Sequence, residues 1–322
     1  MEPILTIAIP TFNHHNLLKK QIINLLPQLT SNINLYILDN CSNPPMRVFL
    51  ENEGINTSQF TIIENNQNIG GDANILKCYS IVKTGWIWVL SDDDLIQKDA
   101  LTKLMKIISE NSDTVFINLH ALKNKQGLTK GYNEFCKNAC YWATFSISHC
   151  IFNMDKFANY LPYYEKQVKT HQPQLLTLLK YLKENNDDIC FFSNVNIFNK
   201  LDPTTWPKAG FIYDTLSIYK SIPQEDLSFF KLTIGRQVIK TQIAFLVIAR
   251  IYEGLSFKNY IYLFKLVINN SPKSHLIFNK SVISWILCLI SPKAYYFFRK
   301  IWIPKSQDYP FSDASKSLNW ND

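Results

Sequence analysis

The chain has little glycine, no hydrophobic run of membrane-spanning length and no regular cysteine pattern. Glycine supplies 9 of 322 residues, less than half of its usual ~7% share, which excludes collagen-like and linker-rich chains. The seven cysteines are odd in number and scattered, which excludes a disulfide scaffold. Because no secretory signal is recognisable, we expect reduced thiols in a cytosolic protein. The apolar stretch after Lys280 has 10 residues, against ~20 for a spanning helix, which excludes polytopic membrane proteins.

Apolar residues are abundant, and charge is unevenly distributed. Apolar residues make up 47% and charged residues 18% of the chain, which supports a large core and excludes disorder over the whole length. A length of 322 residues predicts about two domains. The formal net charge is +7, yet residues 228–306 contain 12 Lys and Arg and one acidic residue, Glu253. We therefore expect a neutral-to-acidic body and a basic C-terminal region that approaches nucleic acid or anionic lipid.

Short apolar runs alternate with helical patterns over the first 120 residues. Apolar runs typical of strands cover residues 5–9, 35–38, 60–63, 86–90 and 114–119, and helical spacing covers 17–26, 72–83 and 98–109. Continuous apolar strands separated by helices predict an α/β fold with a mostly parallel central sheet flanked by helices. Further along, the patterns predict strands over 144–152 and 189–198, a helix over 173–183, and an almost wholly helical region beyond residue 223.

Polar residues follow four of the predicted strands directly. They are Thr11-Phe12-Asn13, Asp39-Asn40, Asn65-Asn66 and Ser91-Asp92-Asp93-Asp94. In a parallel sheet, ligands bind beyond the carboxyl ends of the strands. We therefore expect these four clusters to form one site.

The cluster Ser91-Asp92-Asp93-Asp94 is the most informative of the four. Three adjacent carboxylates repel one another, and a hard divalent cation relieves that repulsion. Mg²⁺ or Mn²⁺ takes one or two carboxylates together with water and phosphate oxygens, so this turn is suited to a metal–diphosphate pair. The alternative is that the aspartates only cap the following helix.

The remaining clusters carry weaker signals. Asp39 and Asn40 can hydrogen-bond a nucleobase or ribose, or form an Asx turn. The glycine-containing loop at residues 68–74 suits close backbone approach to a ligand, or simply begins a helix capped by Asp72. Thr11 and Asn13 have a similar alternative, with Asn13 as a helix cap.

The stretches 7–13 (IAIPTFN), 38–40 (LDN), 68–70 with 73–74 (NIG, AN) and 90–95 (LSDDDL) occur in this order along the chain. Together they resemble the N-terminal half of family 2 glycosyltransferases of GT-A fold, and most nearly the abequosyltransferase-like enzymes of bacterial surface-polysaccharide assembly. The resemblance implies a GT-A domain over 1–222, with a nucleotide-binding half (1–120) and an acceptor-side half (121–222). A helical, basic and aromatic C-terminal region over 223–322 would follow.

The resemblance also implies roles for individual residues. Asp93 and Asp92 would match the metal-binding DXD position, with Mn²⁺ or Mg²⁺ as the cofactor. Pro10 and Thr11 would line the nucleotide pocket, and Asp39 would contact the base. The donor-binding residues implied are Pro10, Thr11, Asn13, Asp39, Asn40, Asn68, Gly70, Asn74, Ser91, Asp92 and Asp93.

Two departures from the family pattern concern the chemistry. Ser91 stands where the family commonly has Asp. The acidic pair that usually supplies the catalytic base is replaced by Thr170-His171-Gln172, ahead of the predicted helix 173–183. His171 can accept a proton near neutral pH, although a histidine at such a place is more often a cap or surface residue. His171 and Asp94 are therefore the catalytic candidates, with the base itself open.

The C-terminal region interleaves aromatic and cationic residues. Trp285, Trp302 and the run Tyr295–Phe298 lie among Lys280, Lys293, Arg299 and Lys300. Such a pattern suits the headgroup interface of an anionic membrane, where polyprenyl-linked acceptors of such enzymes reside. Packing on the catalytic domain or in a homodimer interface is the alternative. The region is too apolar, and lacks a recognition motif, for nucleic acid.

The resemblance to family 2 glycosyltransferases implies a metal-assisted, inverting hexosyltransferase. It would move a sugar from a nucleotide-sugar donor to a saccharide acceptor, lipid-linked, in the synthesis of O-antigen, lipooligosaccharide or capsule. It would be cytoplasmic and peripheral at the inner face of the membrane. The alternative is a non-catalytic sugar-nucleotide-binding or membrane-associated scaffold protein with a degenerate GT-A domain. A dinucleotide-dependent oxidoreductase is excluded because Pro10-Thr11-Phe12-Asn13 replaces the glycine-rich turn after the first strand.

Overall fold

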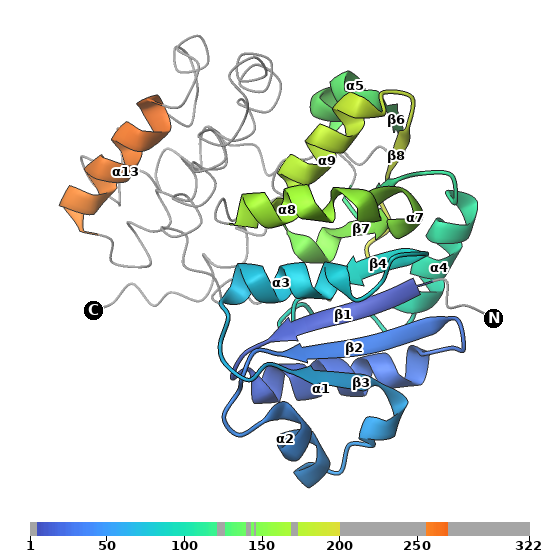
Figure 1. Ribbon diagram of the computed structural model, residues 1–322, viewed down its shortest axis with the longest axis vertical. Coiled ribbons are helices and arrows are strands. Elements are labelled where there is room, and N and C mark those ends of the chain that lie inside the picture. The colour runs from blue at the N-terminus through green and yellow to red at the C-terminus, as the bar shows by residue number, and fades with distance from the viewer. Residues whose placement is uncertain are drawn as a thin grey trace, which may run out of the picture. The chain divides into compact units, whose positions relative to one another are not determined.

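The computed structural model describes residues 5–120, 126–139, 143–144, 146–168, 173–199 and 256–269 (Figure 1). The chain divides into two compact units, Met1–Leu201 and Asp202–Asp322. In the second unit, the described part contains one helix, α13 (Phe257–Asn269). The domain boundary predicted after residue 222 and the catalytic candidate His171 lie outside the described residues.

The described part of the first unit contains an eight-stranded sheet with the order β3-β2-β1-β4-β7-β5-β8-β6. The strands are β1 (Leu5–Thr11), β2 (Ile33–Asp39), β3 (Thr61–Glu64), β4 (Trp86–Val89), β5 (Phe116–Asn118), β6 (Gly127–Lys130), β7 (Cys150–Asn153) and β8 (Ile189–Phe192). β1 to β4 pair in parallel, β7 lies antiparallel between β4 and β5, and β8 is parallel to β5. The carboxyl ends of the parallel strands therefore lie at the edge where β7 begins. This is called the carboxyl edge below.

Helices cover both faces of the sheet (Figure 1). One face carries α1 (His15–Leu25), α2 (Met46–Asn52) and α4 (Ala100–Glu110), whose apolar residues join one core cluster. On the other face, α3 (Gly71–Ser80) and α8 (Leu161–Gln167) meet: the ring centroid of Tyr79 lies 5.2 Å from that of Tyr164 and 5.6 Å from that of Phe152. The remaining described helices are α5 (Gly131–Asn138), α7 (Met154–Phe157) and α9 (Pro173–Glu184), with 3₁₀ turns η1 (Leu26–Gln28), η2 (Thr57–Gln59), η4 (Ile147–His149) and η5 (Ala158–Tyr160).

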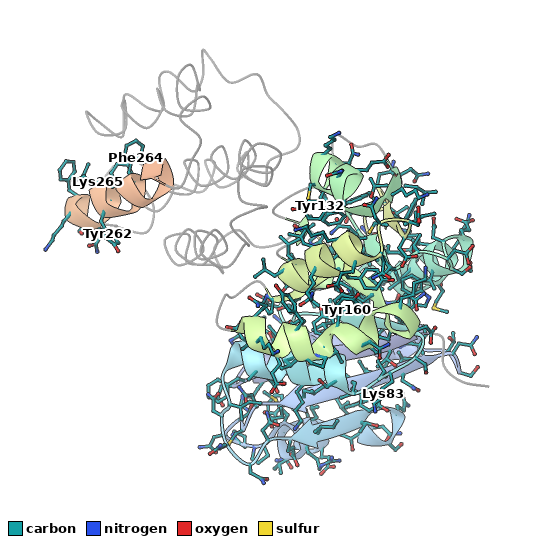
Figure 2. The ribbon with its side chains drawn as sticks, turned by 45° about the horizontal axis from the view of Figure 1, so that its top comes forward. Lys83, Tyr132, Tyr160, Tyr262, Phe264 and Lys265 are labelled. Atoms are coloured by element: carbon teal, nitrogen blue, oxygen red, sulfur yellow. The ribbon has the colours of Figure 1, made fainter. Side chains whose placement is uncertain are left out.

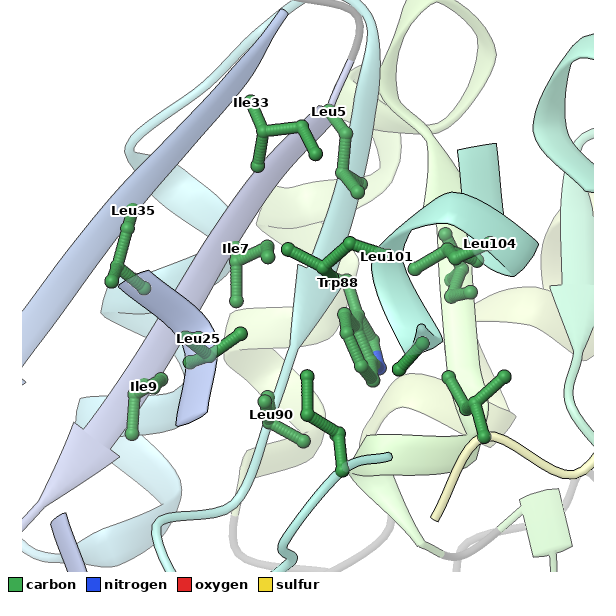
Figure 3. Packing of buried hydrophobic residues seen from close by; sticks show 14 of the residues in the cluster. Leu5, Ile7, Ile9, Leu25, Ile33, Leu35, Trp88, Leu90, Leu101 and Leu104 are labelled. Carbon is green, nitrogen blue, oxygen red and sulfur yellow. The ribbon is translucent and has the colours of Figure 1, made fainter. Parts of the chain in front are cut away.

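The core lies between the parallel strands and the first helix layer (Figure 3). Leu5, Ile7 and Ile9 alternate along β1 and point to this side, as the two-residue period of a strand requires. Trp88 of β4 is fully buried beside them. Its indole Nε1 donates a 2.8 Å hydrogen bond to the main-chain oxygen of Ser148, so its polar atom is not stranded in the core.

The predicted alternation of strands and helices is confirmed, but three strand predictions were too long. The strand predicted over 114–119 forms β5 over Phe116–Asn118 alone. The segment predicted as a strand over 144–152 instead forms η4 and then β7. The strand predicted over 189–198 ends as β8 at Phe192. Beyond it, the side chains of Ser193 and Asn196 accept hydrogen bonds from the main-chain N–H groups of residues 195 and 198. Such local bonds replace ladder hydrogen bonds and end a strand.

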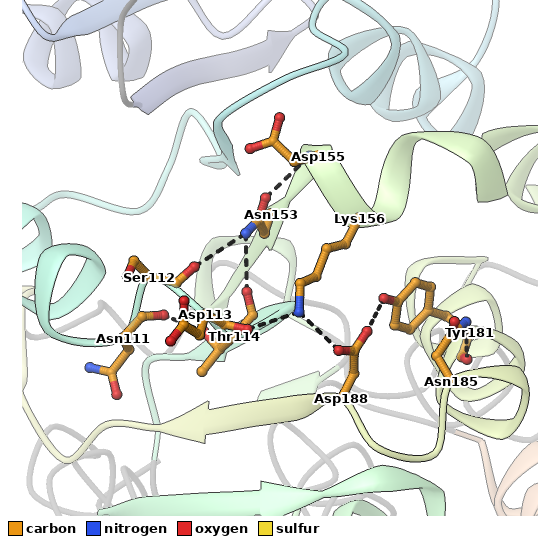
Figure 4. Close-up of polar contacts among 10 residues, drawn as sticks. All are labelled: Asn111, Ser112, Asp113, Thr114, Asn153, Asp155, Lys156, Tyr181, Asn185 and Asp188. Atoms are coloured by element: carbon orange, nitrogen blue, oxygen red, sulfur yellow. Dashed lines mark hydrogen bonds and ion pairs between the residues drawn. The ribbon is translucent and has the colours of Figure 1, made fainter.

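A network of polar side chains connects helices and turns at the edge of the sheet opposite the carboxyl edge (Figure 4). Lys156 Nζ donates to the main-chain oxygen of Asp113 at 2.9 Å and to Asp188 Oδ1 at 2.8 Å. Asp188 also accepts from the hydroxyl of Tyr181. A cleft of about 660 Å³ near this network is lined by residues including Tyr160 and Tyr163. These groups join α7, α9 and the turn before β8, and none of them belongs to the predicted site.

None of the helices in the described ranges is both long enough and apolar enough to span a membrane.

Candidate functional site

The fold brings the described members of the predicted site to the carboxyl edge. Thr11 and Asp39 end the neighbouring strands β1 and β2 and are register partners. The main-chain N–H of Asn40 donates to the oxygen of Thr11 at 2.9 Å. The loop that begins α3 and the turn Ser91–Asp94 (called the aspartate turn below) follow β3 and β4 at the same edge.

Asp92 joins the aspartate turn to the end of β1. Thr11 Oγ1 donates to Asp92 Oδ2 at 2.6 Å, and His14 Nδ1 lies 3.1 Å from both carboxylate oxygens. Burial raises the pKa of Asp92 above its ordinary value, while the hydrogen bonds from Thr11 and His14 lower it. The side chain is thus held in one orientation by groups about 80 residues away in the sequence.

Asp94 is the buried carboxylate at the other end of the turn. Burial raises its pKa to about 6, with smaller contributions from Asp93 and Asp92 and an opposing hydrogen bond from Ser148. Gln21 Nε2 donates to the main-chain oxygen of Asp94 at 2.7 Å. The turn therefore holds negative charge in a position where a cation would relieve unfavourable repulsion.

Asp93 lies between these two and is partly exposed. Ser91 Oγ donates to Asp93 Oδ1 at 2.5 Å. In the described ranges, no three His, Cys, Asp or Glu side chains are grouped as metal ligands. Mg²⁺ and Mn²⁺ bind through one or two carboxylates plus water and phosphate oxygens. The turn therefore fits a divalent ion that is completed by a ligand's own oxygens, with Asp93 the carboxylate least enclosed by protein.

The side chains of Asp39 and Asn13 already accept hydrogen bonds from main-chain N–H groups. The two carboxylate oxygens of buried Asp39 accept 2.9 Å hydrogen bonds from the N–H groups of Ser42 and Met46, the latter at the start of α2. Asn13, at φ +58°, accepts from the N–H of Asn43 at 2.8 Å. The Asx-turn alternative for Asp39 therefore has a structural basis. Each carboxylate oxygen has a second lone pair, with which it can accept a hydrogen bond from a nucleobase as well. Base contact by Asp39 therefore stays a prediction.

Four asparagines form one hydrogen-bonded group beside β2, called the asparagine cluster here. Asn40 Nδ2 donates to Asn68 Oδ1 at 2.8 Å, and Asn40 Oδ1 accepts from Asn65 Nδ2 at 3.1 Å and the N–H of Ile69 at 2.9 Å. Asn74 Nδ2 donates to the oxygen of Leu38 at 2.9 Å, and its Oδ1 accepts from Asn65 Nδ2 at 3.0 Å. The cluster fixes the loop that precedes α3 against the end of β2.

Comparison with known proteins supplies the family. Residues 6–159 match the family model described as Glycosyl transferase family 2. This segment is a family 2 glycosyltransferase domain. Abequosyltransferase RfbV of Salmonella typhimurium is 27% identical over 114 residues, which are 34% of this chain and 34% of the relative. The chain thus matches about a third of the length of that curated relative.

The chain also resembles solved structures. S. aureus TarS, residues 1–349, superposes with a TM-score of 0.59 at 12% identity, covering 93% of this chain and 92% of that chain. A mannosyltransferase from Pyrobaculum calidifontis in complex with GDP-Man and Mn²⁺ has a TM-score of 0.47 at 12% identity, covering 94% and 88%. The likeness to TarS confirms the predicted GT-A fold. Divalent metals are common in enzymes of this fold.

Three residues that touch the predicted site were missed from the sequence of this glycosyltransferase domain. His14 and Gln21 precede or lie within α1 and contact the aspartate turn, and Ser148 contacts it from η4. These three carry no local pattern, because only the tertiary fold brings them to the turn. Asn65, by contrast, was expected at the site because it directly follows a strand, and it joins the asparagine cluster.

Replacing Asn40 with alanine is expected to loosen the loop before α3. The change removes the hydrogen bonds of Asn40 with the N–H of Ile69 and with the side-chain amides of Asn65 and Asn68, and one such bond contributes about 0.5–1.5 kcal/mol. We expect a loss of roughly 3 kcal/mol in the free energy of unfolding, measured by urea titration. Asn56→Ala, which removes an exposed asparagine bonded to Ser58, is the control. Equal effects of the two variants would contradict a special role for the cluster.

Proposed function

We propose that the protein transfers a sugar from a nucleotide-sugar donor to a saccharide acceptor in bacterial surface-polysaccharide synthesis, with inversion at the anomeric carbon. The observation that carries the proposal is the aspartate turn, held against Thr11 at the carboxyl edge of a GT-A sheet. Family 2 membership of residues 6–159 and the similarity to an abequosyltransferase support the reaction class.

In this proposal different residues of the carboxyl edge bind different parts of the donor. Asp93, with Asp92 as the second candidate ligand, would hold Mn²⁺ or Mg²⁺. Such an ion, when bound, neutralises charge on a departing nucleoside diphosphate. Thr11 and His14 keep Asp92 from rotating, so the turn needs little rearrangement when donor binds.

The nucleoside would lie over β1, β2 and the asparagine cluster. Gly70 has φ +88°, a conformation that glycine adopts without strain, and it precedes the first turn of α3. The main-chain N–H groups at the start of a helix favour an anionic ligand. Pro10, Asp39 and Asn74 would line this part of the site, and Asp94 would stay a catalytic candidate beside the leaving group.

The acceptor side completes the proposed reaction. An acceptor hydroxyl would attack the anomeric carbon opposite the diphosphate and lose its proton to a base, for which His171 is the candidate. His171 lies outside the described residues. Exchange of His171 for glutamine, with transfer rates measured against pH, would show whether a group of imidazole-like pKa is lost.

We also propose that the C-terminal unit contacts an anionic membrane surface at the inner face of the cytoplasmic membrane, near a lipid-linked acceptor. On α13 the side chains of Phe257 and Tyr262 are each 56% exposed, and Lys258 and Lys265 are exposed with them. Figure 2 shows Tyr262 and Lys265 projecting from this helix. Cations near such a surface contribute about 1 kcal/mol each.

Vesicle sedimentation tests the membrane proposal on the full chain. Binding is expected to vesicles containing phosphatidylglycerol and to fall about 10-fold or more in Lys258→Glu/Lys265→Glu, because two cations become anions. Vesicles of phosphatidylcholine alone are the control. Equal binding to both vesicle types would remove the proposal, and a concentration-dependent dimer by analytical ultracentrifugation would favour the homodimer instead.

A donor screen tests the proposed function. The full-length protein is incubated with UDP-, CDP-, GDP- and dTDP-sugars and Mn²⁺, Mg²⁺ or EDTA, and both melting temperature and released nucleoside diphosphate are measured. We expect one donor to raise the melting temperature, since it binds only the folded state, and to be hydrolysed slowly with metal but not with EDTA. Tight binding without release, with or without saccharide acceptors, would instead favour a non-catalytic binding protein.

A further inference from the structure

The 3₁₀ turn η4 connects the aspartate turn to the next part of the sheet. Ser148 Oγ accepts a 2.9 Å hydrogen bond from the N–H of Ser91, and Ser148 also hydrogen-bonds Asp94. The following residue, His149, accepts through its main-chain oxygen from the N–H of Leu119, just beyond β5, at 2.9 Å. Thus η4 touches the turn on one side and the end of β5 on the other.

Two histidine side chains meet at this point. The rings of His120 and His149 are 6.3 Å apart between centroids and nearly perpendicular, at 82°. His149 Nδ1 lies 2.9 Å from Ser146 Oγ, and its ring packs at 4.7 Å on Phe198. His120 is partly exposed at the carboxyl end of β5. Burial lowers the pKa of His149 to about 3, with a smaller contribution from His120, so its ring is neutral and can both donate and accept a hydrogen bond.

The strand order places this histidine pair beyond the aspartate turn along the carboxyl edge, on the side away from the asparagine cluster. From one side, the order is β3, β2, β1, β4, β7 and β5. The asparagine cluster lies over β2 and β3, the aspartate turn follows β4, and the histidine pair lies at β7 and β5. A nucleotide sugar is a linear molecule in which the diphosphate separates the nucleoside from the sugar. With the nucleoside at β2 and the diphosphate at β4, the sugar extends toward β7 and β5.

We propose that His120 contacts the transferred sugar of the donor and that His149, wedged between His120 and Phe198, is the positioning residue that orients it. This inference rests on the proposed function and adds the part of the site that distinguishes one sugar from another. Imidazole nitrogens are suited to sugar hydroxyls because a neutral ring offers one donor and one acceptor. The pair is therefore assigned to hexose selection, separate from the groups that hold nucleoside and diphosphate.

Imidazole NMR on the full-length protein tests this assignment. The six histidines are isotope-labelled, and the signals of His14, His120 and His149 are assigned with single variants. Spectra are recorded with Mg²⁺ and, in turn, UDP, UDP-glucose, CDP, CDP-glucose, GDP and GDP-mannose. We expect the His120 and His149 signals to move with a nucleotide sugar that binds but not with its own nucleoside diphosphate. The His14 signal, beside Asp92, should move with both.

Affinity measurements give the second readout. In His120→Ala the Kd of the bound nucleotide sugar is expected to rise about 5- to 10-fold, as for the loss of one hydrogen bond, while the Kd of the matching diphosphate stays within about twofold. His120→Gln, which keeps a donor and an acceptor, should recover part of the loss. If a nucleotide sugar binds and shifts the NMR signal of His14 but not those of His120 and His149, this inference is overturned and the proposed function still stands. Binding of none of the three nucleotide sugars or diphosphates would overturn both.

Discussion

Replacing Asp93 with asparagine is expected to slow nucleoside diphosphate release by about 100- to 1,000-fold, the usual effect of removing one group that stabilises transition-state charge. Asparagine keeps the size of Asp93 and can still accept the hydrogen bond from Ser91 Oγ. It lacks the negative charge that would hold a divalent ion beside the diphosphate. The measurement is the initial rate of diphosphate release from the donor selected by the screen, at saturating Mn²⁺.

The matched control is Asp99→Asn, six residues further along the chain. Asp99 is 59% exposed and pairs with Lys103 at 2.9 Å, and a surface pair of this kind contributes little. Its rate should match the wild type. The Asp93 variant should also be no less stable than the wild type, because Asp93 raises the pKa of both neighbouring aspartates. A folded Asp93→Asn protein that keeps the wild-type rate would contradict the metal assignment.

The alternation of apolar runs and helical patterns was enough to predict the α/β sheet, since each run encodes a buried strand locally. It did not predict that β7 would enter antiparallel between β4 and β5. That choice depends on pairing partners far apart in the chain. The same long-range pairing explains why Ile147–His149 form η4 in place of a strand: Ser148 accepts hydrogen bonds from Trp88 and Ser91.

The candidate site was predictable to a similar extent. Residues directly following strands, such as Asp39 and Asp92, could be placed at one edge because parallel topology requires it. The sequence alone could not predict which of these carboxylates accept hydrogen bonds from other parts of the protein. Asp39 caps α2, and Asp92 is held by Thr11 and His14, and both facts depend on contacts made only in the folded chain.

Asp94→Asn is expected to stabilise the ligand-free protein at neutral pH. A folded-state pKa of about 6 in place of 3.8 corresponds to roughly 3 kcal/mol of unfavourable free energy once the carboxylate is ionised. Asparagine has nearly the same shape and no charge. We expect a gain of about 2 kcal/mol in the free energy of unfolding at pH 7.5, measured by urea titration with EDTA present, with Asp99→Asn as the unshifted control.

The pH dependence separates this cause from a simple packing effect. Because the folded protein holds the Asp94 proton more tightly than the unfolded chain, the favourable contribution of Asp94 is complete below pH 3.8 and is lost as the pH rises through about 6. The advantage of Asp94→Asn should therefore be small near pH 4 and full above pH 7, whereas a packing effect would be the same at both. Adding Mn²⁺ and nucleoside diphosphate should narrow the difference by stabilising the wild type, since a bound cation favours the ionised carboxylates that repel one another without it.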